Sequence, residues 1–571
     1  MRTKKFSMYG LTGGLLVVLF LIITLTTGAQ AKAPLRPGML ISAGKNVYYI
    51  SAVKKIRPLT AAGFKANSFK HKLIIKVTAK QIKGWLVGKK ITGYEKKLAQ
   101  ETKPAPVSAP TPAPILIVPT PALAPTPAPS PAPTPTLVPT PAPAPTQPNP
   151  TVPTTGATYY VATSGNNSNN GSSASPWATP AHGASQLKPG DTLIIRGGTY
   201  AMTDYENHII RPPSGDVSNY VVIKGEDSDR PVLAGGNNLL TAIDLSNKSF
   251  VKISNLEIKS NNGAHFRDGI QALDGPADHI VLENLYIHNL DEFGINIGDT
   301  DDIKIINSVI SYTGYGSIGG PAGSRGGWKN ALISGSTLSY GGHYYQGKNA
   351  LGPYDRPDGF GIEPSAGPIE IANTIAEHNR GDGLDSKAEN TYIHDSVVAN
   401  NNSDGVKLWG TNSKLERTLI YGRGDGASDA SPWSAIVIHT QKRDANFTIA
   451  NVTVDDYLGG NYLMHVQYDY PSVPVNLTIT NSIFSSRGAN APIYTADAVK
   501  YTVTNSDFYF PNSSYIWDSG GKNLTSSQVG MLGDNNVYGD PKFAAAAWGA
   551  NGDYHLGSGS AATASMGYHA Q

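Results

Sequence analysis

The stretch ISNLEI (Ile253–Ile258) recurs as LENLYI (Leu282–Ile287), IINSVI (Ile305–Ile310) and further variants of one apolar frame with a central polar residue. The central residues are Asn255, Asn284, Asn307, Asn373, Asn451, Asn481 and Asn505, with Asp395 and Arg417 in phase as substitutes and Gly335 in an intermediate turn. Most successive positions are 22 to 34 residues apart. A repeat of this length, with short strands and no helical period, predicts a parallel β-helix rather than a sandwich.

The asparagine column has a structural explanation. Each coil of a β-helix needs a sharp corner between two strands, and asparagine tolerates the left-handed backbone conformation that such a corner requires. Its side-chain amide can also hydrogen-bond to the asparagine of the next coil. We therefore expect Asn284, Asn307 and Asn373 to lie in one column of corners, and we do not interpret the column as a sugar-binding ladder.

A second frame begins with Asp-Gly and occurs three times, as DGFGIE (Asp358–Glu363), DGLDSK (Asp382–Lys387) and DGVKLWG (Asp404–Gly410). The frames start 24 and 22 residues apart, so each fits one coil. Their first residues form one predicted column and their fourth residues another: Asp358, Asp382 and Asp404, then Gly361, Asp385 and Lys407. Carboxylates beside one lysine on the same face are what calcium-assisted proton abstraction from an acidic sugar needs.

The structural alternative for these frames is turn chemistry, because Asp-Gly pairs are common in turns. Single pairs also occur at Asp268-Gly269, Asp274-Gly275 and Asp425-Gly426. For Lys407 the alternative is a solvent-facing salt bridge to Asp385 of the preceding coil. Two features favour a functional site: the frame occurs in three consecutive coils, and its fourth residue changes from Gly361 to Asp385 to Lys407.

The N-terminus indicates export. The chain has 571 residues and no cysteine, and basic residues within its first five positions precede an apolar run from Leu11 to about Thr24. Ala29-Gln30-Ala31 then offers small residues to a signal peptidase. We predict that residues 1–31 are a signal peptide, with a retained membrane anchor as the alternative. A protein secreted from a bacterium or held at its surface fits the absence of disulfides.

Charge is distributed unevenly along the chain. Residues 1–155 carry 20 Lys and Arg against two acidic residues, whereas the remainder carries 26 against 41. Most of the basic residues lie in residues 35–101, where the apolar runs Val47–Ile50 and Leu73–Val77 predict a small β-containing module. This module could bind anionic cell-envelope polymer or a membrane surface. A solvated charged surface is the alternative, and export argues against nucleic acid as a partner.

Composition sets the remaining boundaries. Residues 104–155 are an uncharged Pro/Ala/Thr-rich tract, which predicts a polyproline linker rather than a packed domain. We expect the β-helix domain to cover residues 158–570. Its opening, YYVATSGNNSNNGSSASPWATP (Tyr159–Pro180), and its closing segment, YHLGSGSAA (Tyr554–Ala562), resemble the ends of secreted right-handed β-helix proteins. The predicted fold class is all-β, a right-handed parallel β-helix (β-solenoid) preceded by a small β-containing module and a Pro-rich linker.

The Asp-Gly frames resemble polysaccharide lyase family nine, the pectate lyases with a right-handed β-helix fold. The resemblance implies that Asp358, Asp382 and Asp385 bind Ca²⁺ as the cofactor. It also implies that Lys407, in GVKLWG, is the catalytic base.

The chain departs from the pattern of that family at three positions. Gly381 stands where the family has a further aspartate, Leu384 replaces an aromatic residue, and Trp409 replaces a glycine. Calcium accepts carbonyl and water oxygens among its ligands, so one missing carboxylate thins the site without abolishing it. The bulky Trp409 leaves open which uronate polymer is the substrate.

The implied reaction is β-elimination in an acidic, pectate-like polysaccharide. Lys407 has a reference pKa of about 10.4 and must be neutral to remove the C5 proton, so an alkaline optimum is expected. A nearby metal cation would disfavour the charged form of the lysine. The candidate substrate-binding residues are three cations that can neutralise acidic sugars and one aromatic residue that can stack on them: Arg356, Arg380, Lys387 and Trp409.

Two other functions are compatible with this scaffold, because a fold alone does not define a function. One is a non-catalytic, adhesin-like β-helix that binds glycans at the cell surface, and the other is a glycoside hydrolase that uses two carboxylates. Lys407 discriminates between the three, because neither alternative needs it. We expect a monomer that acts on an acidic polysaccharide.

Overall fold

The computed structural model describes residues 150–568, except for 423–433, 457–461, 469–472, 489–491 and 547–551, and also residues 40–43, 46–52, 55–66, 74–77, 82 and 86–92. These residues fall into two compact units, one within residues 1–134 and one within residues 135–571. The predicted signal peptide (1–31) and most of the predicted linker (104–155) lie outside the described residues. In the part of the chain that is described, no helix is long and apolar enough to cross a membrane.

The first unit contains a five-stranded sheet and one short helix. Its elements are β1 (Leu40–Ala43), β2 (Asn46–Ala52), β3 (Lys55–Pro58), α1 (Ala61–Ala66), β4 (Ile74–Lys76) and β5 (Leu86–Val87). The strand order is β4-β1-β2-β3-β5, and β1, β2 and β3 are antiparallel neighbours. The strands predicted around residues 47–50 and 73–77 are therefore present as β2 and β4.

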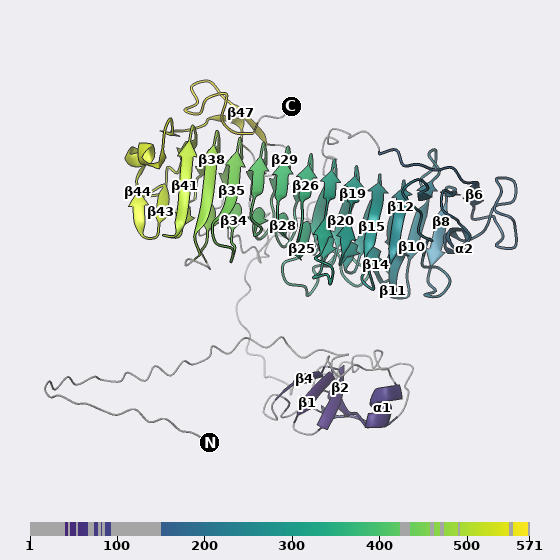
Figure 1. Ribbon diagram of the computed structural model, residues 1–571. Helices are drawn as coiled ribbons and strands as arrows, with labels where there is room; N and C mark the ends of the chain where they lie inside the picture. Colours follow the sequence, from purple (N-terminus) through teal and green to yellow (C-terminus); the bar gives the residue numbers. More distant parts are fainter. Residues whose placement is uncertain are drawn as a thin grey trace, which may run out of the picture. The chain divides into compact units, whose positions relative to one another are not determined.

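The second unit is a parallel β-helix in which three long sheets run side by side (Figure 1). The first sheet contains β6 (Thr158–Val161), β7 (Thr192–Ile195), β9 (Val221–Gly225), β12 (Lys248–Ser254), β15 (Ala277–Glu283), β19 (Ile303–Ile306), β23 (Ala331–Ser334), β26 (Ile369–Ala372), β29 (Thr391–His394), β32 (Ser413–Glu416), β35 (Ala445–Ala450), β38 (Val475–Thr480) and β41 (Val499–Thr504).

The second sheet contains β8 (Thr199–Met202), β10 (Val232–Gly235), β13 (Glu257–Ser260), β16 (Tyr286–Leu290), β20 (Val309–Thr313), β24 (Thr337–Gly341), β27 (Ile375–Glu377), β30 (Val397–Ala399), β33 (Leu419–Tyr421), β36 (Thr453–Asp456), β39 (Ile483–Ser486), β42 (Asp507–Tyr509) and β45 (Val537–Tyr538). The third contains β11 (Leu239–Asp244), β14 (Phe266–Ala272), β17 (Phe293–Ile297), β21 (Gly316–Gly320), β25 (Phe360–Ser365), β28 (Leu384–Ala388), β31 (Val406–Leu408), β34 (Ile436–Ile438), β37 (Met464–Val466), β40 (Ile493–Thr495), β43 (Trp517–Ser519) and β44 (Lys522–Leu524). From β9 to β43, one strand from each sheet makes one coil, and β44 closes the third sheet as an antiparallel partner of β43.

The predicted column of corners is confirmed. It lies where each coil passes from the first sheet to the second, and its members have positive φ: Asn255, Asn284, Asn307, Gly335, Asn373, Asp395, Arg417, Asn451, Asn481 and Asn505. The predicted amide stacking is also present, because Asn284 Nδ2 donates to Asn255 Oδ1 at 3.1 Å and the amide of Asn505 donates to Asn481. The repeat therefore specifies both where the chain turns and how the coils stack.

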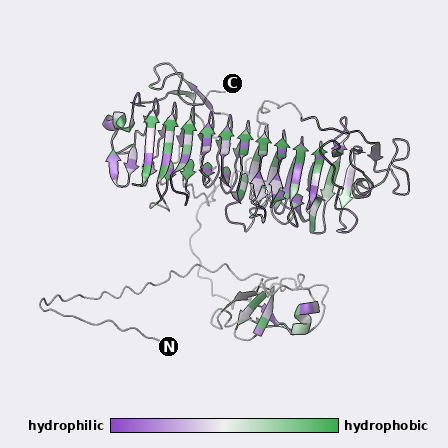
Figure 2. Cartoon of the chain, viewed as in Figure 1, coloured by the Kyte–Doolittle hydropathy of each residue, from purple (hydrophilic) through white to green (hydrophobic). Residues whose placement is uncertain are grey.

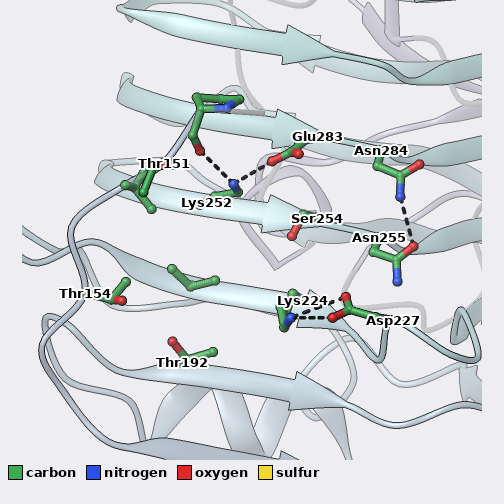
Figure 3. Close-up of a pocket in the computed structure, with 13 residues that line it drawn as sticks. Thr151, Thr154, Thr192, Lys224, Asp227, Lys252, Ser254, Asn255, Glu283 and Asn284 are labelled. Carbon is green, nitrogen blue, oxygen red and sulfur yellow. Dashed lines mark hydrogen bonds and ion pairs between the residues drawn. The ribbon is translucent and has the colours of Figure 1, made fainter. Parts of the chain in front are cut away.

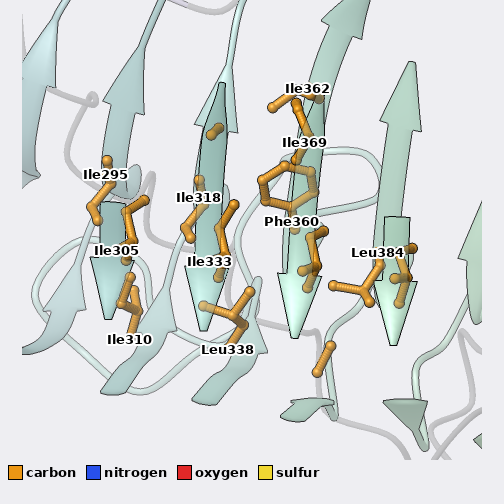
Figure 4. Packing of buried hydrophobic residues seen from close by; sticks show 14 of the residues in the cluster. Ile295, Ile305, Ile310, Ile318, Ile333, Leu338, Phe360, Ile362, Ile369 and Leu384 are labelled. Atoms are coloured by element: carbon orange, nitrogen blue, oxygen red, sulfur yellow. The ribbon is translucent and has the colours of Figure 1, made fainter. Parts of the chain in front are cut away.

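A continuous apolar core fills the inside of the coil. Hydrophobic and hydrophilic residues occur within the same strands (Figure 2), as expected when one face of each sheet packs inward and the other faces out. Figure 4 shows side chains of all three sheets meeting in this core, among them Ile305 of the first, Leu338 of the second and Phe360 of the third. Burial of this kind is the dominant favourable contribution to folding.

The ends and insertions of the β-helix have their own short elements. These are α2 (Pro180–Ser185), the paired β18 (Thr300–Asp301) and β22 (Trp328–Lys329), a 3-10 helix (Ser526–Leu532), and the antiparallel pair β46 (Phe543–Ala545) and β47 (Asp553–Leu556). A long connection between β24 and β25, residues 342–359, leads into the first Asp-Gly frame. That frame and the next two lie in the middle of the third sheet.

Candidate active site

The three Asp-Gly frames lead into consecutive strands of the third sheet, β25, β28 and β31. The pairing register places Gly361 opposite Asp385, and Asp385 opposite Lys407, so the predicted column is confirmed. The neighbouring Phe360 and Leu384 are fully buried in the core. Because successive side chains of a strand point to opposite faces, the column containing Asp385 and Lys407 lies on the outer face of the sheet.

One oxygen of each frame aspartate has a structural role. Asp358 Oδ1 accepts the backbone N–H of Asp382 at 2.7 Å. In the next coils, Asp382 Oδ1 accepts the N–H of Asp404 at 2.9 Å, and Asp404 Oδ1 accepts that of Ser434 at 3.0 Å. The turn-chemistry interpretation of the frames is therefore right for one carboxylate oxygen, while the other oxygen of Asp382 and of Asp404 contacts a charged side chain.

The glycine that follows each aspartate is required by the stacking of the coils. A Cβ atom on Gly359 would lie 2.6 Å from the carbonyl oxygen of Gly383, and one on Gly383 would lie 2.8 Å from that of Gly405. Real Cβ atoms do not approach backbone this closely, so a side chain here would force adjacent coils apart. The frame thus combines a packing requirement with a carboxylate.

The predicted metal ligands Asp358, Asp382 and Asp385 lie together. Each offers one carboxylate oxygen, and these oxygens lie within 4.8 Å of one another. Burial and the two neighbouring carboxylates raise the pKa of Asp358 well above its usual range, and burial raises the pKa of Asp385 to about 6. Carboxylates that repel one another in a shielded site are stabilised by a cation placed between them.

These residues fit a calcium ion. Oxygens bound to one Ca²⁺ at about 2.3–2.6 Å lie at most about 5 Å apart, which the three carboxylate oxygens satisfy. Calcium takes about six to eight oxygen ligands, so backbone, water or substrate oxygens would have to complete the shell. The donor set is all-oxygen and acidic, which is the chemistry that a hard divalent cation prefers.

Gly381 cannot be replaced by the further aspartate of the resembling family without a change of backbone. A Cβ at this position would lie 2.3 Å from Asp358 Oδ1 and 2.5 Å from the carbonyl oxygen of Arg356. The backbone of residue 356 therefore occupies the space that another carboxylate would need. The packing of the 342–359 connection thus leaves no room for a further carboxylate at residue 381.

Lys407 lies beside the carboxylates and is ion-paired to two of them. Its Nζ is 2.5 Å from Asp382 Oδ2 and 2.9 Å from Asp404 Oδ2, and its side chain is only 10% exposed. Burial by itself would lower the pKa of Lys407, but Asp382, Asp404 and Asp385 raise it above its usual value. The solvent-facing salt bridge to Asp385 is thus replaced by a buried pair of contacts to two other aspartates.

Asp404 was predicted only as a member of the Asp-Gly column, and neither as a metal ligand nor as a partner of Lys407. It is buried, and burial together with Asp382 raises its pKa to about 6, while Lys407 acts in the opposite direction. The available signal was its place at the start of the third frame. Without the structure, nothing indicated that this carboxylate, rather than Asp385, would hold the lysine.

Two of the predicted substrate-binding residues hold the carboxylates in place. Trp409 Nε1 donates to Asp385 Oδ1 at 3.0 Å. Lys387 Nζ lies 3.1 Å from Glu363 Oε1 and 3.5 Å from Asp385 Oδ2. The structure therefore places both next to Asp385, where they orient a candidate metal ligand, and Lys387 also lines the adjoining groove.

The two predicted arginines are placed differently from each other. Arg356 lines the groove next to Asp358. Arg380 donates from Nη1 to the carbonyl oxygen of Gly352 at 3.0 Å, inside the 342–359 connection. Arg380 thus supports the loop that forms one side of the site, and the structure does not bring it to the groove lining.

The groove has a volume of about 540 Å³ and lies on the third sheet over β17, β21 and β25. Its size is in the range of about 300–1,000 Å³ that is usual for small-molecule sites. Phe293 and Tyr315 form an aromatic wall, with ring centroids 4.6 Å apart. Gly319 and Gly361 belong to its lining and leave the outward column without side chains between Asn296 and Asp385.

A different hollow, of about 570 Å³, lies on the first sheet near the start of the β-helix (Figure 3). Its charges are already paired, since Lys252 Nζ lies 2.5 Å from Glu283 Oε2 and Lys224 Nζ lies 3.1 Å from Asp227 Oδ2. It has no carboxylate cluster of the kind that adjoins the groove, within the described residues. The groove on the third sheet is therefore the candidate active site.

Residues 159–422 match the family model described as Pel9A-like, right handed beta helix region. The match covers a little under half of the chain and includes all three Asp-Gly frames. It confirms the resemblance to pectate lyase-like proteins and the right-handed sense of the β-helix. Comparison with curated protein sequences finds no match.

Solved structures with a similar course of the chain share little sequence with it. The structure of XylC with xylose is 9% identical (TM-score 0.41) and covers 69% of this chain and 88% of its own. The A-module of mannuronan C-5 epimerase AlgE4 from Azotobacter vinelandii is 13% identical (TM-score 0.41), and the match covers 61% of this chain and 88% of the A-module. Pectate lyase Pel9A is 16% identical (TM-score 0.37), and the match covers 72% of this chain and 91% of the lyase. Values this low do not transfer an activity to this chain.

Proposed function

We propose that this protein is an exported polysaccharide lyase that cleaves an acidic, uronate-containing polymer of pectate type by calcium-assisted β-elimination. One observation carries the proposal: three carboxylates converge beside Lys407, which is paired in register with one of them, Asp385, at the end of a groove on the outer face of the coil. The Pel9A-like match over residues 159–422 supports it.

Lys407 is the base in this proposal. In β-elimination the base takes the proton from C5, the C–H electron pair becomes the C4–C5 double bond, and the bond from C4 to the glycosidic oxygen breaks. The pair of electrons of the broken C4–O bond leaves with the glycosidic oxygen, which takes a proton from water. Asp382 and Asp404 favour the charged form of Lys407 and so raise the pH that is needed to form the neutral amine. Only the neutral amine can act as the base. Activity should therefore increase toward alkaline pH.

The remaining residues bind and orient. Asp358, Asp382 and Asp385 would hold Ca²⁺, whose charge, when it is bound, would neutralise the substrate carboxylate and make the C5 proton more acidic. Trp409 keeps Asp385 in place through its indole N–H. Arg356 and Lys387 line the groove as cations that can attract the carboxylates of neighbouring uronate units.

The front of the chain has a separate role in this proposal. Residues 1–31 direct export, and residues 104–155 act as a linker. Residues 35–101 hold the enzyme on anionic envelope polymer or a membrane surface through their excess of Lys and Arg. The enzyme acts as a monomer.

The full chain should be incubated with pectate, alginate and other uronate polymers, once with Ca²⁺ and once with chelator. Ultraviolet absorbance of the unsaturated product then follows elimination. Product that forms only with calcium supports the proposal. Release of reducing ends without unsaturation would indicate a glycoside hydrolase, and binding without cleavage would indicate the adhesin-like function.

A further inference from the structure

The groove continues away from the carboxylates to a polar side chain that the reaction does not use. Asn296 of β17 stands in the same outward column as Gly361 and Asp385, because the register pairs it with Gly319 and Gly319 with Gly361. Its position is three strands from Asp385, roughly 14 Å at about 4.8 Å per strand. This distance exceeds the length of one sugar ring.

The amide of Asn296 is held in one orientation. Its Nδ2 donates to Asp268 Oδ2 at 3.0 Å, while Asp268 Oδ1 accepts the backbone N–H of Phe293 at 2.9 Å. Asp268 is itself only 1% exposed. Burial raises the pKa of Asp268 to about 7. Above that pH its carboxylate only accepts hydrogen bonds, so the amide nitrogen faces Asp268 and the amide oxygen points the other way.

That amide oxygen has no partner. Asn296 is 7% exposed and lines the groove, and its Oδ1 is buried without a hydrogen-bond donor among the described residues. A buried acceptor that is left unpaired costs free energy, and such groups are rare in folded proteins. A ligand that brings a hydroxyl or another donor to this point would remove that cost.

The surroundings favour a sugar ring as the ligand. The aromatic wall of Phe293 and Tyr315 belongs to the same groove. A side chain at Gly319 could not fit, because its Cβ would lie 2.4 Å from the ring of Phe293. Apolar and aromatic walls with one fixed polar group are typical of small-molecule sites. The ring of Phe293 therefore covers the outward side of Gly319 and forms part of the groove wall between Asn296 and Asp358.

We infer that Asn296 forms a distal subsite, at which its amide oxygen accepts a hydrogen bond from a hydroxyl group of the bound polysaccharide, more than one sugar unit away from the reacting unit. Asp268 is the positioning residue that orients the amide. The polymer then lies across β17, β21 and β25, along the axis of the coil. The choice of a uronate polymer as the ligand rests on the proposed function, whereas the subsite itself rests on the groove and the unpaired oxygen.

The test compares substrates of different length in the full chain. In Asn296→Ala, kcat/KM for a hexagalacturonate should fall about 2- to 10-fold, as expected for one lost hydrogen bond, while that for a trigalacturonate should stay unchanged. Tyr315→Ala should also lower kcat/KM for the hexagalacturonate. Because Tyr315 is 40% exposed, its replacement should leave the fold intact, so this variant tests the subsite even if Asn296→Ala misfolds. Asn207→Ala is the matched control, because its amide also binds an aspartate, Asp204, but in an exposed loop outside the groove lining.

A second readout does not need catalysis. Calorimetric binding of hexagalacturonate to Lys407→Arg should weaken when Asn296→Ala is added. An equal loss for short and long substrates, or binding of the hexamer that is independent of Asn296, would overturn the subsite. If the wild type forms no unsaturated product but binds the hexamer through Asn296, the lyase proposal falls and the subsite stands.

Discussion

Replacing Lys407 by arginine separates its role as an ion-pair partner from its role as a base. Arginine keeps a positive charge between Asp382 and Asp404, so the free energy of unfolding should stay close to that of the wild type. The guanidinium group remains protonated at any working pH and cannot accept the C5 proton. Removal of a positioned base typically costs about 10²- to 10⁴-fold in rate. We expect a loss of elimination of that size, measured by ultraviolet absorbance of the product.

Lys407→Met removes the charge as well as the base. The Nζ contacts at 2.5 Å to Asp382 and 2.9 Å to Asp404 are both buried, so their loss leaves two carboxylates without a cation. Breaking a buried pair in this way costs about 3–5 kcal/mol. Urea unfolding in chelator should show a destabilisation of that size, and adding Asp404→Asn should recover part of it because one buried charge is then removed.

Two results would contradict this reasoning. If Lys407→Arg cleaves the polymer at the wild-type rate, Lys407 is not the base. If Lys407→Met is as stable as the wild type, the two ion pairs contribute nothing, and the buried carboxylates must then be neutral or paired with another cation.

Asp382→Asn should weaken calcium binding strongly in a calorimetric titration, and unchanged affinity would return the Asp-Gly frames to a purely structural role. Asp507→Asn tests a buried carboxyl group, because burial raises the pKa of Asp507 to about 7. The wild type should therefore lose stability as the pH rises from about 4 to 7, at about 1.4 kcal/mol per pKa unit. In urea unfolding, the variant should be more stable than the wild type by up to about 4 kcal/mol at pH 8 and should show no such gain at pH 4. Gly383→Ala should cost about 1–3 kcal/mol because its Cβ meets the next coil, whereas Gly530→Ala, with nothing within 4 Å, should be neutral in the same denaturation assay. Deleting residues 32–155 should abolish salt-sensitive binding to anionic envelope material and leave activity on soluble polymer within a few-fold, and a complete loss of activity would refute a separate role for the front module.

The corners of the coil could be predicted from the sequence because they depend on local conformation. Asparagine or glycine is tolerated in the left-handed region, so Asn373 and Gly335 marked their corners by residue type alone. Arg417 also adopts this conformation, with φ of 39°. It could be placed only through its phase in the repeat, and its ion pair with Asp395 of the preceding coil, at 2.7 Å, explains how it is accommodated.

The column of Asp385 and Lys407 could also be predicted, because one residue per coil falls at the same place when the repeats are aligned. The partners of these residues could not. Which oxygen of Asp382 faces Lys407, and which caps the next coil, depends on side-chain directions around a backbone hydrogen bond. The same is true of Asn296, because its stretch FGINIG (Phe293–Gly298) contains no acidic residue and no lysine and therefore carried no chemical signal.

By itself, the sequence determined the fold class of the β-helix, the place of its corners and the coils that carry the carboxylates, because repeat length, backbone preference and register are local or periodic properties of the chain. Only the tertiary structure decided that Asp404 shares Lys407 with Asp382, that the backbone at Arg356 excludes a further ligand at Gly381, and that a groove extends from Asp358 to Asn296. These features arise between coils and from the 342–359 connection. Charge, burial and excluded volume act there across distances in space that no spacing in the sequence encodes.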